Sequence, residues 1–90
     1  MEIKKLDRRM KGYGYFTRCL DFTKREQSRF IEIRNWCWAT WGPSCEYEFW
    51  HPNPPNHLGN PSWCWITDEW RLRIYLTGDK EVQWFHLKWG

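Results

Sequence analysis

The clearest pattern of apolar and polar positions lies between residues 24 and 41. Apolar side chains recur there at i, i+3, i+7 and i+11, at Phe30, Ile33, Cys37 and Trp41. This spacing places them on one face and predicts a helix over 24–41. Thr23 and Glu26 form the Thr-x-x-Glu capping box that begins many helices. Gly42 followed by Pro43 is a typical helix end.

Segments in which apolar and polar residues alternate predict β-strands on both sides of this helix. They are the segments at residues 12–22, 45–50, 62–67, 70–76 and 81–89. In the first of them, Phe16, Leu20 and Phe22 are expected on one face. In the last, apolar residues fall on both faces, which we attribute to a bulge or to burial on both sides. Residues 77–80 contain Gly78 and are expected to form the hairpin turn before it.

The order of these elements is β-α-β-β-β-β, which predicts an α+β fold of two layers. The helix at 24–41 is expected to pack on one face of a mostly antiparallel sheet, whose last three strands form a meander. The segment from His51 to Pro61 holds four prolines, which predict a long loop without regular structure. A length of 90 residues allows one domain. We place it at 12–90, after a flexible leader at 1–11.

Aromatic residues make up 20% of the chain, with nine Trp, five Phe and four Tyr. This composition argues against intrinsic disorder, because disordered chains are poor in aromatic residues. No stretch approaches the roughly 18 apolar residues of a membrane-spanning helix. The basic start of the chain is not followed by the apolar region of a secretory signal. We therefore expect a cytoplasmic protein without a membrane partner.

The net charge of +3 lies in the first eleven residues. Residues 1–11 carry five basic and two acidic side chains, whereas residues 12–90 carry nine of each. The five basic residues are Lys4, Lys5, Arg8, Arg9 and Lys11. Nucleic-acid-binding domains usually carry their basic surface on the folded body. The distribution therefore favours a solvated leader over a nucleic-acid-binding site.

Four cysteines and three histidines are the candidates for metal binding. Cys37 and Cys64 each stand between two Trp residues, where a thiol is expected to be buried as a small apolar group. Without a secretory signal, we expect reduced thiols. The candidate zinc ligands are Cys37, Cys45, His51, His57 and Cys64. Their spacing lacks a C-x-x-C pair that would hold the metal locally, so no metal and no cofactor is expected.

Nucleophilic catalysis would need a cysteine and a histidine within hydrogen-bond reach. The loop at 51–61 joins strands that carry Cys45 and Cys64, so either thiol could approach His51 or His57. The sequence has no G-x-S-x-G motif, no phosphate-binding Gly-rich loop and no H-E-x-x-H motif. We therefore expect that the protein is not an enzyme.

Aromatic and arginine side chains are expected to gather on the sheet face that the helix leaves open. Apolar residues of the strands and of the helix, Ile31 and Trp38 included, already fill the helix side. The residues assigned to the open face as partner-binding side chains are Trp50, Arg71, Arg73, Tyr75, Trp84 and His86. Trp, Tyr and Arg are enriched at the centres of protein–protein interfaces.

These observations favour a small, tryptophan-rich, non-enzymatic module that binds another protein or a second copy of itself. Small proteins of this kind are common among the accessory proteins with which phages inhibit or modulate a host enzyme, which is a general expectation rather than an inference from any residue. The first alternative is a single-stranded nucleic-acid binder that uses the sheet aromatics and the basic leader. The second is a small Cys/His enzyme or zinc protein.

Overall fold

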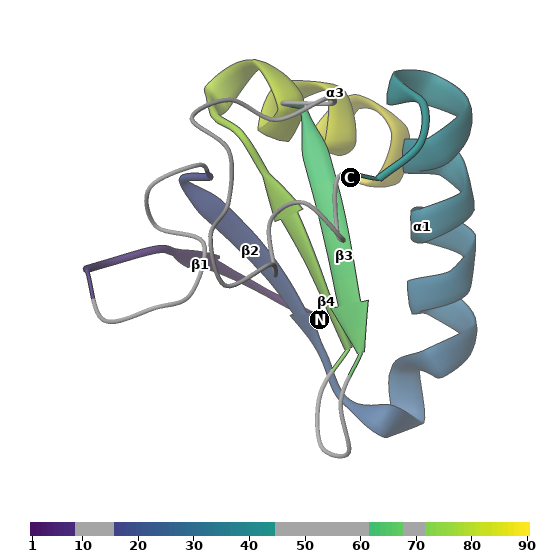
Figure 1. Ribbon diagram of the computed structural model, residues 1–90. Helices are drawn as coiled ribbons and strands as arrows, with labels where there is room; N and C mark the ends of the chain where they lie inside the picture. The colour runs from purple at the N-terminus through teal and green to yellow at the C-terminus, as the bar shows by residue number, and fades with distance from the viewer. Residues whose placement is uncertain (9–15, 45–61, 68–71) are drawn as a thin grey trace.

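The computed structural model describes residues 1–8, 16–44, 62–67 and 72–90. Within them the order of strands and helices is β-β-α-β-β-α (Figure 1). The elements are β1 (Glu2–Lys5), β2 (Arg18–Phe22), the 3-10 turn η1 (Lys24–Glu26), α1 (Gln27–Trp41), β3 (Trp63–Thr67), β4 (Leu72–Leu76) and α3 (Asp79–Trp89). The α+β class and the packing of a helix on an antiparallel sheet are confirmed, whereas the predicted order is wrong.

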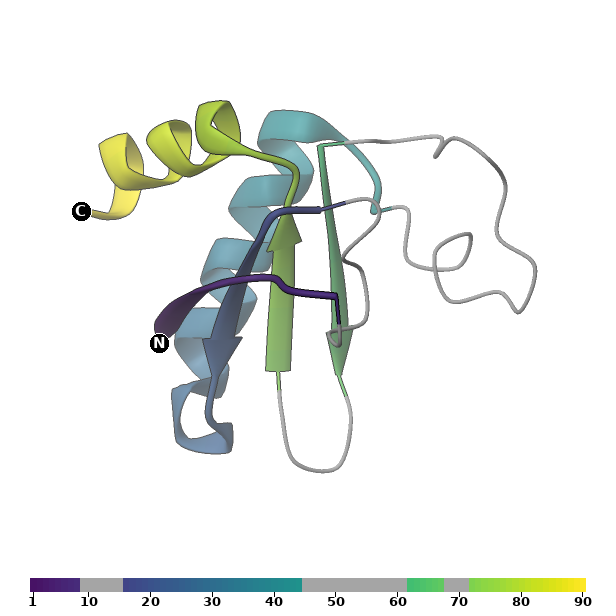
Figure 2. The same ribbon diagram turned by 90° about the vertical axis from the view of Figure 1, so that its left-hand side faces the viewer.

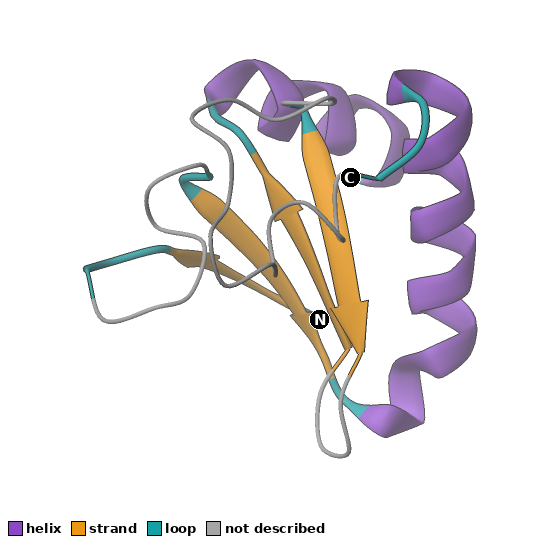
Figure 3. Ribbon diagram, in the orientation of Figure 1, coloured by secondary structure: helices purple, strands orange, loops and turns teal. Residues whose placement is uncertain are grey.

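The four strands form one antiparallel sheet in the order β1-β2-β4-β3. β3 and β4 form the expected hairpin pair, with Thr67 opposite Leu72 at one end and Trp63 opposite Leu76 at the other. α1 contacts β3 and β4 and covers one face of the sheet (Figure 3). α3 leaves the end of β4 and lies across one end of the sheet, as the turned view shows (Figure 2).

Apolar side chains are buried on both faces of this sheet. The larger cluster lies between the sheet and the helices and contains Leu20, Phe22, Phe30, Ile33, Cys37, Trp63, Leu72, Ile74, Leu76 and Phe85. The smaller cluster contains Leu6, Phe16, Cys19, Cys64 and Tyr75. Neighbouring residues of a strand point to opposite faces, which is why Ile74 belongs to the first cluster and Tyr75 to the second.

The predicted boundaries of the first helix are confirmed. The backbone N–H of Thr23 donates to Glu26 Oε1 at 3.0 Å, so the capping box is formed. The helical segment opens with η1, continues as α1 and ends at Trp41. Gly42 follows with φ 92°, a backbone conformation that favours glycine because it has no Cβ.

The segment predicted as the last strand is the helix α3. Gly78 is its N-cap rather than part of a hairpin turn, and its N–H donates to Glu81 Oε1 at 3.1 Å. Val82, Phe85 and Trp89 follow at i, i+3 and i+7, and all three pack on the larger cluster. Helical spacing therefore brings these residues onto one face, whereas a strand would place Val82 opposite the other two.

The first strand, β1, lies in the segment that the sequence analysis assigns to the leader. Ile3 packs against the larger cluster, and Leu6, the residue that follows β1, is buried in the smaller one, so this segment is anchored on both faces of the sheet. Arg9 and Lys11 lie outside the described residues, and the division of the chain at residue 12 stays a prediction. The predicted strand at 45–50, the loop at 51–61 and Trp70 also lie outside them.

Phe16 occupies the opposite face from the one predicted. Its ring lies 5.9 Å from that of Tyr75, in the smaller cluster rather than beside Leu20 and Phe22. The chain bends at Thr17, before β2 begins, so the alternation of the strand does not extend back to Phe16.

Candidate functional site

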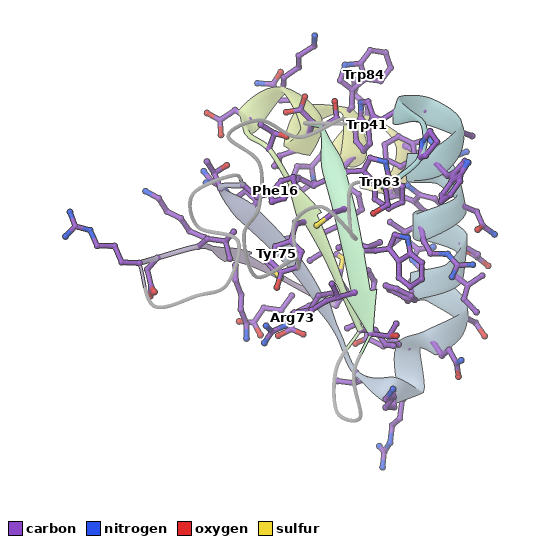
Figure 4. All side chains as sticks on the ribbon, viewed as in Figure 1. Phe16, Trp41, Trp63, Arg73, Tyr75 and Trp84 are labelled. Carbon is purple, nitrogen blue, oxygen red and sulfur yellow. The ribbon has the colours of Figure 1, made fainter. Side chains whose placement is uncertain are left out.

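The sheet residues predicted to bind a partner are not exposed as expected. Tyr75 is fully buried in the smaller cluster, and this burial raises the pKa of its hydroxyl. Arg73 Nε lies 3.7 Å from Asp21 Oδ1, and the Arg73 side chain is 17% exposed. Figure 4 shows Phe16, Arg73 and Tyr75 on the side of the sheet away from α1. On this part of the predicted open face, Tyr75 therefore belongs to the core and Arg73 is engaged in an ion pair.

A short array of charges ties three strands of the sheet together. Asp21 accepts a hydrogen bond from Lys4 Nζ at 3.0 Å and also faces Arg73. The three residues come from β1, β2 and β4. Lys4, one of the five basic residues of the proposed leader, is thus engaged within the fold. Lys5 and Arg8 are exposed, and whether they contact nucleic acid stays a prediction.

The other two described residues of the predicted site, Trp84 and His86, lie on α3 and not on a strand. Trp84 is 50% exposed, and its ring stands at the upper end of the molecule in Figure 4. His86 is exposed, with Nδ1 at 3.4 Å from the carbonyl oxygen of Gly90. Trp50 and Arg71 lie outside the described residues. The structure therefore divides the predicted set between the sheet and α3.

Large apolar side chains are exposed on the helices. Ile31 and Trp38 of α1 are 37% and 51% exposed, and Leu87 of α3 is 82% exposed. The prediction that Ile31 and Trp38 lie in the core is wrong, because α1 turns the residues at 30, 33 and 37 toward the sheet and these two to its flank. We use the term exposed helix set for Ile31, Trp38, Trp84 and Leu87.

An aromatic seam joins α1 to α3. The ring of Trp36 lies 5.1 Å from that of Trp41 and 6.2 Å from that of Trp89, both edge-on. The Arg29 guanidinium lies 4.6 Å above the Trp89 ring. Edge-on aromatic pairs and cation–π contacts are both favourable. The seam therefore fixes the two helices relative to each other and presents their outer residues on a rigid support.

A second aromatic contact supports Trp38 on the flank of α1 nearest β3. The Trp38 ring lies 6.4 Å from the buried ring of Trp63. Arg34 lies 4.9 Å above the ring of Trp65 on the same strand. Trp38 is thus held against the core by one face while half of its surface remains open to a partner.

The described cysteines are poor candidates for catalysis. Cys19, Cys37 and Cys64 are buried, and burial raises the pKa of the Cys37 thiol to about 12. A thiol with such a pKa is almost entirely protonated at neutral pH, and the thiol is a weak nucleophile. The described ranges contain no group of three or more metal-ligating side chains. Cys45, His51 and His57 lie outside these ranges.

Ile31, Trp38 and Leu87 are the members of the exposed helix set that the predicted binding site omits. The spacing of Ile31 and Trp38, seven residues apart, gives the signal for a shared helix flank. Leu87 could be found only by treating 81–89 as a helix, because a strand places it beside Phe85.

No described helix has both the length and the apolar character needed to cross a membrane. A comparison with family models, curated proteins and solved structures finds no match to this chain.

Proposed function

We propose that the protein is a non-enzymatic module that binds another protein through the exposed helix set on α1 and α3. One observation supports the proposal more than any other: Trp38, Trp84 and Leu87 are each at least half exposed on helices whose inner faces are already packed. Trp in particular is enriched among the residues that supply most of the binding energy at protein interfaces.

The rigidity of the support strengthens this proposal. The helices are joined by the seam of Trp36, Trp41 and Trp89, so their exposed side chains need little ordering when a partner binds. Binding costs less conformational entropy when the surface is already in its bound form. A module of this kind that docks on an enzyme would inhibit or modulate that enzyme, and this role is part of the proposal.

The nucleic-acid alternative receives less support from the described residues. Its sheet aromatics include Tyr75, which is fully buried, and its basic leader includes Lys4, which pairs with Asp21. Bases would therefore need to stack on the helices, where the exposed helix set offers two indole rings and two aliphatic side chains. Aliphatic side chains provide no stacking surface for a base.

Affinity capture from an extract of the source cell tests the proposal. The full chain, Trp38→Ala, Trp84→Ala and the control Thr40→Ala should be compared after nuclease treatment. We expect a discrete protein that the wild type and the control retain and that at least one Trp variant loses. Equal retention by all four chains, or loss of every bound species on nuclease treatment, would refute the proposal.

A further inference from the structure

The outer face of α3 combines apolar and cationic side chains. Lys80, Gln83, Trp84 and Leu87 follow at i, i+3, i+4 and i+7, and all four are exposed. This spacing places them along one stripe of the helix, opposite the buried Phe85. Lys88 lies one turn beyond Trp84 and is exposed as well. Trp84 therefore stands between two lysines, each four residues away.

The carboxylates of α3 are directed away from this stripe. Asp79 Oδ1 lies 3.4 Å from Arg18 Nη2, and Glu81 accepts the N–H of Gly78 at the helix start. Neither Lys80 nor Lys88 forms an ion pair with any residue that the structure describes. The Lys88 ammonium lies 5.6 Å from the centroid of the Trp89 ring, a contact that leaves its charge without a carboxylate. The stripe thus presents positive charge around an apolar centre and carries no acidic residue of its own.

We propose that this stripe binds a segment of the partner protein in which carboxylate side chains alternate with apolar ones. The inference rests on the proposed function and names the chemistry of its partner. Trp84 and Leu87 would bury the apolar residues of that segment. Lys80 and Lys88 would each face an Asp or Glu, and such complementary charges fix the register and orientation of the bound segment.

The same charges argue against the other occupants of this surface. A second copy of the chain would pair the stripe with itself around a two-fold axis. Antiparallel pairing of two α3 helices centred on Trp84 would then bring Lys80 of one copy opposite Lys88 of the other, and these like charges repel. A nucleic acid would satisfy the lysines but would leave Leu87, at 82% exposure, against phosphate or sugar.

Selection from a random-peptide display library on the immobilised full chain tests the inference, because the library supplies segments of every composition. The variants are Lys80→Glu/Lys88→Glu, Leu87→Ser and the charge-matched control Lys5→Glu/Lys24→Glu, each checked by thermal unfolding. We expect peptides enriched in Asp or Glu interleaved with apolar residues. Their affinity should fall about tenfold or more with the α3 double variant and remain unchanged with the control.

Four outcomes would overturn the inference. Peptides that require Leu87 but show no preference for acidic residues would refute it while leaving the proposed function intact. Failure to select any peptide that depends on Leu87 or on the two α3 lysines would also refute the inference. The proposed function would then be tested only by the affinity-capture experiment described above. Displacement of the peptides by a single-stranded oligonucleotide would assign the stripe to nucleic acid. A dimer in sedimentation that Leu87→Ser dissociates would assign it to a second copy.

Discussion

The indole N–H of Trp63 donates a hydrogen bond to the carbonyl oxygen of Gly42 at 2.8 Å. This contact joins the first residue of β3 to Gly42, the C-cap residue that follows α1. Trp63 is fully buried, and its ring also supports Trp38 on the flank of the helix. One side chain thus fixes the end of α1, the edge of the sheet and a residue of the proposed binding surface.

Replacing Trp63 with Phe should destabilise the fold. The variant keeps an aromatic ring but leaves the Gly42 carbonyl oxygen without this donor and reduces the packed volume. We expect a loss of about 1–3 kcal/mol in the free energy of unfolding, measured by urea denaturation. Trp38→Phe is the matched control, because Trp38 is half exposed and should change stability by less than about 0.5 kcal/mol. Equal midpoints for the two variants would contradict the role given to Trp63.

A side chain at position 42 should lower the stability of the fold. The φ of 92° and ψ of −171° at Gly42 lie in a region that only glycine adopts readily. We expect Gly42→Ala to lower the free energy of unfolding by about 1–3 kcal/mol. Thr40→Ala, an exposed substitution in the last turn of α1, should have little effect or stabilise slightly, because Ala is the best helix former. A Gly42→Ala variant as stable as the wild type would show that the helix ends differently.

Glu26 should contribute to stability in a pH-dependent manner. Hydrogen bonds from the N-terminal ammonium and from the backbone N–H of Thr23 lower the pKa of its carboxyl group below the ordinary 4.5. A lowered pKa in the folded state means that the contribution is present above about pH 4.5 and is lost as the pH falls through the folded pKa. The urea midpoints of wild type and Glu26→Gln should differ near pH 7, and the difference should shrink as the pH falls below 4.5. A difference that does not depend on pH would contradict this assignment.

Phe85 and Leu87 distinguish a helix from a strand at the end of the chain. A strand would place both on the same face, whereas α3 buries Phe85 and leaves Leu87 82% exposed. Phe85→Ala should therefore cost about 3–5 kcal/mol, and Leu87→Ala less than about 0.5 kcal/mol. Thermal unfolding followed by circular dichroism measures both effects. Similar losses for the two variants would support the strand and refute α3.

The sequence predicts those elements in which local signals and tertiary packing agree. The capping box at Thr23 and the glycine at position 42 define the ends of the first helix, and strict alternation identifies β4. Both signals act over a few residues and do not depend on distant contacts. The burial of Leu72, Ile74 and Leu76 follows from the same alternation.

The elements that cannot be predicted from the sequence depend on packing with distant residues. Trp84, Phe85 and Trp89 have high β-propensity, but the core selects the helical face formed by Val82, Phe85 and Trp89. β1 contains one apolar residue, Ile3, and is recognisable only through its pairing with β2. The predicted exposure of Tyr75 is wrong for the same reason, because the side chain is buried by distant residues of the smaller cluster.

Site-specific photo-crosslinking would show whether the exposed helix set is the surface that binds a partner protein. A benzophenone amino acid placed at position 38, 84 or 87 of the full chain would be activated in a nuclease-treated extract of the source cell, with exposed Ser28 and Lys5 as control positions. We expect one discrete polypeptide that crosslinks to at least one of the three test positions and to neither control. Crosslinks that are the same at all five positions, or that form only with nucleic acid when nuclease is omitted, would contradict the proposed function.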